Sequence, residues 1–259
     1  MTTPVAQTLN PVEYEAPLVN QSPDGLYTVT TFVSQTSDVP RWLASGVRVR
    51  PHNYGGEEAF GVWDAPWCGD PGDSLKDGER PGLPDPFDPY TVWAYDQCDL
   101  TLPSQQEVRE RAAQNLRLIE PVAVEREFAA RLLADAGTAE PVTDLAAAVG
   151  HIEAQFAATN TVGLIHASAG LAALADRYGL IVRAGGVLKS PLGHTWVFGG
   201  GYVEGLGETI VGTSPTFGWR NTVEVRETIE AKFNQFVAVA ERSVVIGYEK
   251  AVAAATLTP

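Results

Sequence analysis

The sequence LPSQQEVRERAAQNLRLIEPVAVEREFAARLLADAG, residues 102–137, decides the fold because it predicts one very long helix. Ser104 is followed three residues later by Glu107, which is the spacing of a capping box, so we expect Ser104 to be the N-cap. The apolar positions have helical period with a slip near Pro121, where we expect a kink. With its end at Gly137, the helix would be about 50 Å long.

The two faces of this predicted helix differ in character. Its apolar positions are Val108, Ala112, Leu116, Ile119, Ala123, Phe128, Leu132 and Leu133. Its polar positions are Glu107, Arg109, Glu110, Arg111, Glu125 and Arg131. We expect the polar face to lie in solvent or against another subunit. Such a helix is much longer than is usual in a globular domain.

The stretch before the helix, residues 61–100, is rich in proline, glycine and aspartate. Its ends, Phe60–Trp63 and Thr91–Tyr95, have strand composition, so we expect a long two-stranded excursion with an irregular tip. An irregular loop this long is unusual inside a compact domain, but it is accounted for if it lies on a neighbouring molecule. Tryptophans would then anchor the contact; the alternative is that they are core residues. They are Trp63, Trp67 and Trp93.

Residues 1–60 have the composition of an extended arm. Proline, asparagine and glycine recur between two β-rich pieces, Leu26–Val33 and Val47–Val49. An arm of this kind buries little by itself and is expected to need other chains or a distant part of its own chain.

The region after the long helix predicts a compact α/β unit. A helix is expected over residues 143–158, a buried strand over Val162–His166 and a further helix over residues 167–178, which ends at Gly179. Short strands and glycine turns follow as far as Pro215. The last third contains one long β-rich stretch, FVAVAERSVVIGY, residues 236–248.

Composition limits the classes of function. The 259 residues carry a net charge of −14, which disfavours broad contact with a phosphate backbone. No apolar run is long enough to span a membrane, and the first thirty residues lack the pattern of a secretory signal. Cys68 and Cys98 are too few for a disulfide framework, and the sequence leaves open whether they pair.

No catalytic, metal-binding or cofactor-binding pattern emerges. The four histidines lack metal-ligand spacing, and they, including His166 beside Ser168, are better read as satisfied core or surface histidines than as a catalytic base or metal ligands. Gly199–Gly201 is followed by no lysine, and we expect a tight turn there with no helix beginning at it. Acidic residues of the excursion lack the order of an EF-hand and are expected to be solvated. They are Asp70, Asp73, Asp77, Asp85 and Asp88.

The order of these elements resembles the HK97-type fold of tailed-phage major capsid proteins and encapsulin shells. The quoted helix is similar to the spine helix of that family, and NTVGLIHASAGLAALADRYGLI (160–181) is similar to the strand and helix of its axial (A) domain. YVEGLGETIVGTSPTFGW (202–219) resembles the strand that ends the A domain, and KFNQFVAVAERSVVIGYEKAVAAATL (232–257) resembles the closing strand of the peripheral (P) domain.

The resemblance implies an α+β chain in five parts. Residues 1–55 would be the N-terminal arm, 56–100 the E-loop, 101–141 the P-domain spine helix, 142–216 the A domain, and 217–259 the C-terminal P-domain strands and tail. Within the E-loop, Trp63, Trp67, Lys76 and Trp93 are the candidate intersubunit contacts. Some family members crosslink an E-loop lysine to an asparagine of another subunit; Lys76 with Asn221 or Asn234 would be the candidates here, against the plainer reading of a solvated loop lysine.

The function implied is that of a major capsid protein and not of an enzyme. Pentamers, hexamers or both would form an icosahedral shell in the host cytoplasm and then the virion, enclosing DNA without sequence-specific binding. Scaffold, portal or decoration proteins are the further partners that the resemblance suggests, with no cofactor and no membrane. The alternatives are an encapsulin nanocompartment, disfavoured by the proline-rich N-terminus, or another virion part such as a tail or decoration protein.

Overall fold

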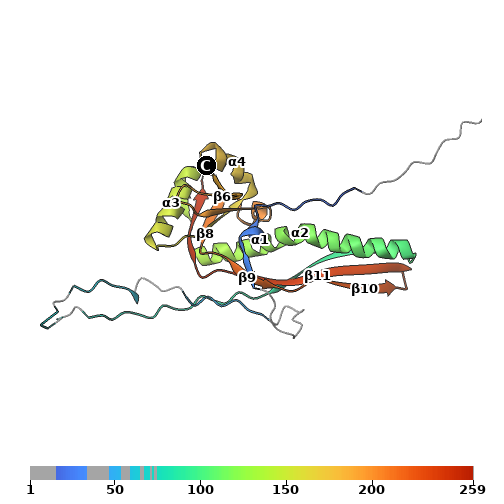
Figure 1. The fold of residues 1–259 in the computed structure, drawn as a ribbon, viewed down its shortest axis with the longest axis horizontal. Helices are drawn as coiled ribbons and strands as arrows, with labels where there is room; N and C mark the ends of the chain where they lie inside the picture. Colours follow the sequence, from blue (N-terminus) through green and yellow to red (C-terminus); the bar gives the residue numbers. More distant parts are fainter. Residues whose placement is uncertain are drawn as a thin grey trace, which may run out of the picture.

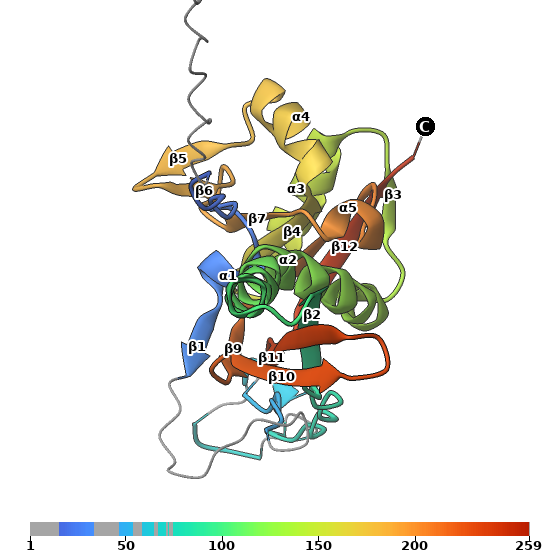
Figure 2. The same cartoon turned by 90° about the vertical axis from the view of Figure 1, so that its right-hand side faces the viewer.

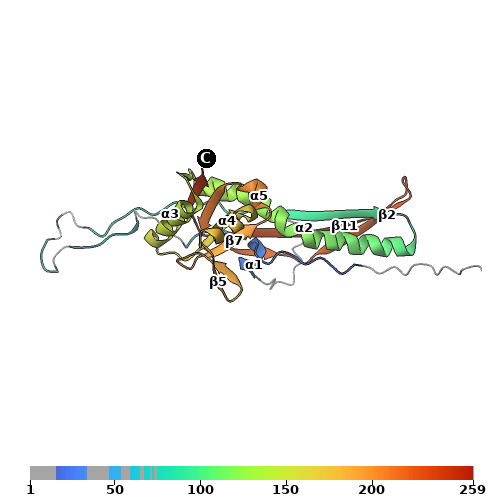
Figure 3. The same ribbon diagram turned by 90° about the horizontal axis from the view of Figure 1, so that it is seen from above.

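The computed structural model describes residues 16–33, 47–53, 59–64, 67–70, 72 and 75–258. Two sheets lie on opposite sides of one long helix, α2 (Figure 2). The described parts of the excursion between the arm and β2 run out from one end of this body as two neighbouring limbs, whereas α2 and its sheet extend toward the other end (Figures 1 and 3). The chain is therefore elongated and presents much of its backbone away from either core.

Helix α2 spans Leu102–Ala136, and the predicted capping box at its start is wrong. The N-cap is Thr101, whose side chain accepts a hydrogen bond from the Ser104 amide. Ser104 itself lies inside the first turn. The helix begins earlier than predicted because Pro103 in the first turn needs no amide donor there, and because Thr101 supplies the capping oxygen.

The helix continues through Pro121 as one assigned element. Proline lacks an N–H group, so the carbonyl of Arg117, four residues earlier, loses its donor within the helix. The side-chain amide of Gln21, from the N-terminal arm, donates to that carbonyl instead. The arm therefore supplies a hydrogen bond that the sequence of the helix itself cannot make.

The first sheet is built around β11 (Gln235–Gly247), which is the predicted long C-terminal strand. Strand β2 (Tyr90–Cys98) pairs with it in antiparallel orientation on one side. On the other side it pairs with β10 (Glu224–Glu230) and β9 (Phe217–Arg220), and β1 (Thr31–Val33) adds to β9 in parallel.

Alternate side chains of β11 pack against α2 because side chains on a strand alternate between its two faces. This core contains Phe236, Ala238 and Ala240 of the strand together with Val108, Ala112 and Leu116 of the helix. Thr91–Tyr95 is thus part of a strand as predicted. In contrast, the described residues 59–64 contain no strand, so the prediction for Phe60–Trp63 is wrong.

The second sheet has seven strands in the order β3-β12-β8-β4-β7-β6-β5. In sequence order they are β3 (Glu140–Val142), β4 (Leu164–Ser168), β5 (Val182–Ala184), β6 (Val187–Lys189), β7 (Thr195–Gly199), β8 (Thr209–Thr213) and β12 (Ala251–Leu257). Helix α3 (Leu145–Ala158) packs its apolar face, with Ile152 and Phe156, into a core shared with Trp196. The last strand of the chain therefore joins the sheet of the predicted A domain.

Three short helical elements complete this unit. The helix predicted over residues 167–178 is a 3₁₀ turn, η3 (Ala169–Leu171), followed by α4 (Ala172–Arg177). Helix α5 (Tyr202–Gly205) begins directly after the glycine triplet, contrary to our expectation that no helix begins there.

The described arm also departs from the prediction. Leu26–Val29 of the β-rich piece forms a helical turn, α1, before β1 begins at Thr31. Leu26 is fully buried in the core between α2 and the two sheets, together with Phe128 and Tyr248. The other predicted piece contributes an isolated bridge between Val49 and Phe87.

Candidate functional site

The strongest candidate for function is the excursion between the arm and β2, because most of its described residues are exposed. Its descending limb, the chain from residue 75 to the start of β2, is attached to α2 by Arg131. That guanidinium donates to the backbone oxygens of Asp85 (2.6 Å) and Pro86 (3.3 Å). It also lies 4.1 Å from the centre of the Phe87 ring. One side chain thus fixes where this limb leaves the body.

The end of the arm, at His52 and Asn53, leads into the ascending limb and is attached by Glu249, in the turn between β11 and β12. Its carboxylate accepts hydrogen bonds from the backbone amides of His52 (2.8 Å) and Asn53 (3.0 Å) and from the Asn53 side chain (2.9 Å). Burial acts to raise the pKa of Glu249, but these hydrogen bonds outweigh it and the net shift is downward. The ionised carboxylate is therefore the form that holds this limb.

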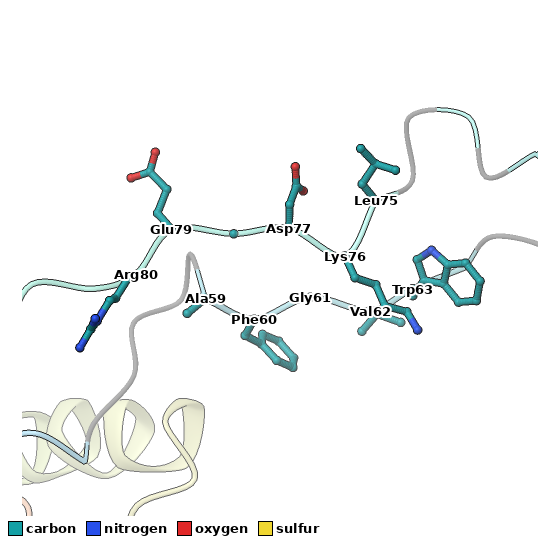
Figure 4. Close-up of a pocket in the computed structure, with 11 residues that line it drawn as sticks. Ala59, Phe60, Gly61, Val62, Trp63, Leu75, Lys76, Asp77, Glu79 and Arg80 are labelled. Atoms are coloured by element: carbon teal, nitrogen blue, oxygen red, sulfur yellow. The ribbon is translucent and has the colours of Figure 1, made fainter.

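Beyond the root the limbs run side by side, at residues 59–63 and 75–80, around an open cavity of about 510 Å³ (Figure 4). Lys76 reaches from one limb toward the other, and its ammonium nitrogen lies 4.2 Å from the centre of the Trp63 ring. The structure therefore brings together two of the predicted contact residues. It places the solvated lysine of the plainer reading on an aromatic face.

The other two predicted anchors are open to solvent. Trp67 is 96% exposed, and Trp93 is 64% exposed on the face of the first sheet that points away from α2. Tyr95 lies on the same face, opposite Val239 of β11. Because both side chains are mostly exposed, the alternative that Trp67 and Trp93 are core residues is wrong within one chain. Tryptophan is mostly buried in folded proteins, so exposed tryptophans of this kind indicate an interaction surface.

The two asparagines considered for a crosslink differ in accessibility. Asn221 is buried, and its side-chain oxygen accepts a hydrogen bond from the Ser243 amide at 2.8 Å. Asn234 is exposed in the turn between β10 and β11, where it adopts a positive φ of 52°. Only Asn234 of the two thus offers its amide without disturbing the sheet.

Both cysteines are free and exposed. Cys68 lies in the described tip of the excursion, whereas Cys98 ends β2 and pairs with Phe236. The excursion and this end of β2 point to opposite ends of the chain (Figure 1). A bridge within one chain is therefore ruled out by the arrangement of the two segments.

The buried histidine has a structural role, as predicted. His166 lies in β4 with no exposed surface, and its two ring nitrogens are 3.0 Å from the Tyr202 hydroxyl and 2.8 Å from the Thr213 hydroxyl. Burial lowers the pKa of His166 to about 3, so the ring is neutral at physiological pH. No group of three potential metal ligands occurs among the described residues, and no described helix could cross a membrane.

Glu125 is the largest departure from the predicted side-chain pattern. It was expected on the polar face of α2, but it is only 2% exposed. Its carboxylate accepts hydrogen bonds from the backbone amides of Leu26 and Gly201, each at 2.9 Å. Burial raises its pKa, against hydrogen bonds from three backbone amides that lower it. The glycine triplet therefore binds a carboxyl group, but that group is a side chain of its own protein.

Close packing explains why glycines surround this carboxylate. A side chain at Gly25 would put its Cβ 2.5 Å from a Glu125 oxygen, and one at Gly199 would put it 2.8 Å from the carboxyl carbon. Glu125 thus joins the arm, α2 and the loop after β7. It was missed because its helical spacing places it beside charged residues, whereas the unusual run of three glycines was a usable signal that a buried group lies close by.

Comparisons with known proteins identify the fold. No model of a known protein family matches the chain, and no curated protein sequence matches it. Solved structures do match along nearly all of its length. The match to a structure of Mycobacterium phage Adephagia covers 96% of this chain and 95% of that one, with 13% identity and a TM-score of 0.53.

Two further matches have comparable quality. The capsid of an empty GTA particle covers 96% of this chain and 94% of its own, with 11% identity and a TM-score of 0.57. The holo-SrpI encapsulin complex from Synechococcus elongatus covers 96% and 91%, with 13% identity and a TM-score of 0.55. The chain therefore has the α+β HK97 fold, as its order of elements predicted.

Proposed function

We propose that this chain is a major capsid protein that assembles into an icosahedral shell enclosing phage DNA. The observation that carries the proposal is the excursion at residues 59–89, which leaves Trp67 almost fully in water. An aromatic side chain can bury about 150–250 Å², which at about 25 cal/mol per Å² corresponds to roughly 4–6 kcal/mol before entropic costs. Contact with a second copy is the simplest way to recover this energy, and a closed shell repeats it in every subunit.

The first sheet offers a suitable receiving surface. Trp93 and Tyr95 lie together on its outer face, away from α2. Large aromatic residues dominate the binding energy of protein interfaces, so this face and the excursion are the surfaces we assign to intersubunit contact. Packing into pentamers and hexamers is a further part of the proposal.

The chain acts as a structural protein and not as an enzyme in this proposal. Three of its buried ionisable side chains have partners within the chain: His166 two hydroxyls, Glu125 two amides, and Glu120 both Tyr27 and Arg242. The net charge of −14 supports a shell that encloses DNA without binding it tightly. Assembly in the host cytoplasm, and contacts with scaffold, portal or decoration proteins, belong to the same proposal.

An encapsulin compartment is the second candidate, because the match to the encapsulin complex is as good as that to the phage structure. The sequence argument against it concerned the N-terminus, most of which lies outside the described residues. Within the described arm, residues 16–25 form no helix. The contents of particles from the native source separate the two: nuclease-protected DNA supports the capsid, and an enclosed enzyme supports the encapsulin.

Expression of the chain alone, followed by negative-stain electron microscopy, tests the assembly. We expect closed particles or capsomer rings. Trp67→Ala should reduce the particle yield severalfold while leaving thermal unfolding of the unassembled chain unchanged. Trp67→Phe, which keeps an aromatic ring, is the matched control and should assemble. A wild-type chain that stays monomeric at high concentration, or a Trp67→Ala variant that assembles normally, would refute the proposal.

A further inference from the structure

A cavity of about 330 Å³ opens between the arm, α2 and the first sheet. The arm contributes Ser22 and Tyr27 to its wall, α2 contributes Arg117 and Glu120, and the sheet contributes Arg220 and Arg242. Three arginines thus face one carboxylate. In a chain with net charge −14, such a local excess of positive charge calls for an explanation.

The single carboxylate is already engaged. Glu120 is 3% exposed and accepts a hydrogen bond from the Tyr27 hydroxyl at 2.7 Å. It also pairs with the terminal nitrogen of Arg242 at 3.2 Å. The Nε atom of Arg242 is buried and has no acceptor among the described residues. Glu120 therefore neutralises one guanidinium at most.

Arg220 has aromatic neighbours but no carboxylate partner within the part of the chain that the structure describes. Its guanidinium carbon lies 4.3 Å from the centre of the Phe32 ring and 5.2 Å from that of Tyr27. These rings orient the group and remove part of its water. A half-buried guanidinium in this setting gains energy when it meets an anion, because charge-assisted hydrogen bonds are stronger than neutral ones.

Sheet register fixes the spacing of the two sheet arginines. Arg220 of β9 lies opposite Val244 of β11, and Arg242 is two residues before Val244. Side chains two residues apart on a strand share a face, so both arginines lie on one face as diagonal neighbours, at roughly 7–8 Å. The cavity can therefore receive two carboxylates that are about 7 Å apart.

The excursion carries such a pair. Asp77 and Glu79 lie two residues apart in an extended limb, and both side chains point away from the opposite limb (Figure 4). Extended residues at this separation are spaced by roughly 7 Å. Both are exposed, and neither forms an ion pair with any described residue. Residues 56–89 contain nine acidic and two basic residues, a net charge of −7 and half that of the whole chain.

We infer that the Asp77 and Glu79 carboxylates of one copy bind in the arginine-lined cavity of a second copy, against Arg220 and Arg242. The inference rests on the proposed shell function and names the electrostatic contact of the excursion. Charge complementarity at this cavity sets the register of the excursion on its neighbour, while the tryptophans supply apolar burial.

Zero-length crosslinking tests this contact directly. The variant Arg220→Lys keeps the charge and places an amine that carbodiimide joins to a neighbouring carboxylate. Particles assembled from mixed heavy and light isotope-labelled chains are treated and digested, and linked peptides are identified by mass spectrometry. We expect a link between Lys at position 220 and Asp77 or Glu79 of another chain, present in particles and absent from unassembled protein. Links from position 220 to other segments only, or none in intact particles, would overturn the inference.

Charge reversal provides the second test. Arg220→Glu should lower the particle yield at least tenfold, and the added change Glu79→Arg should restore much of it. Arg183→Glu, an exposed change on β5, is the matched control and should have little effect. Failure of the wild type to form particles would count against the shell function itself, whereas wild-type particles without rescue would count against this contact alone. Salt-sensitive DNA binding that depends on Arg220 would assign the cavity to phosphate instead.

Discussion

Removal of the Glu125 carboxylate should loosen the arm from the body. Glu125→Ala leaves the amides of Leu26 and Gly201 without acceptors, and a buried unsatisfied group costs about 1–3 kcal/mol. The expected loss in the free energy of unfolding is therefore about 2–6 kcal/mol, reduced by the relief of burying a charge. Glu125→Gln keeps one oxygen, loses one acceptor and should lose about 1–3 kcal/mol.

Glu127→Gln is the matched control, because Glu127 is exposed on the same helix two residues away. Urea unfolding of the unassembled chain gives the free energies. Hydrogen exchange measured by mass spectrometry gives the location: peptides over residues 24–33 and 199–206 should exchange faster in the Glu125 variants. The reasoning fails if Glu125→Gln is as stable as wild type, or if exchange rises evenly over the chain.

Other consequences follow from groups with shifted pKa values or defined anchoring contacts. Burial lowers the pKa of His166 to about 3, from about 6.5 in the unfolded chain. The contribution of His166 to the free energy of unfolding should therefore be constant above pH 6.5 and fall below it by up to about 1.4 kcal/mol per pH unit. In urea unfolding at several pH values, His166→Gln should remove this part of the slope. Glu249→Gln should speed amide exchange at His52 and Asn53 and leave the exchange of α3 unchanged. Equal exchange at residues 52–53 in the variant and the wild type would contradict the anchoring role. If mature particles are crosslinked, denaturing electrophoresis should show multimer bands that Asn234→Asp or Lys76→Arg abolishes and Asn221→Asp spares.

The long helix and its neighbours were predictable because their signals are local. Apolar residues at helical spacing between residues 108 and 132 specify α2 without reference to any other segment. The same holds for α3, for β11 and for the exposed excursion. The predicted start of α2 was wrong because two local signals competed. The capping-box spacing indicated Ser104 as the N-cap, but Thr101 caps the helix and Pro103 lies in its first turn.

The contacts that join the segments were not predictable, because their partners are far apart in sequence. Glu125 and Leu26 are separated by 99 residues, and Gln21 and Arg117 by 96. A glutamate on a charged helical face looks like a solvated residue until the arm is placed over it. The glycine run at 199–201 could indicate a close neighbour but could not identify it, since only the folded chain shows that Gly25 and Gly199 leave room for the same carboxylate.

The arm and the excursion illustrate two ways in which a long helix can hold irregular chain. The arm is held by polar groups that the helix buries: the Arg117 carbonyl freed by Pro121, and the carboxylates of Glu120 and Glu125. Among the described residues, the excursion is attached to the body at its root, and farther out Trp67, Asp77 and Glu79 are exposed. Because both segments lie on the same polypeptide, satisfying the arm within the chain while leaving the excursion open makes the monomer a stable unit that is still incomplete. This division fits the proposed assembly, in which a subunit folds alone and gains further stability by meeting another copy.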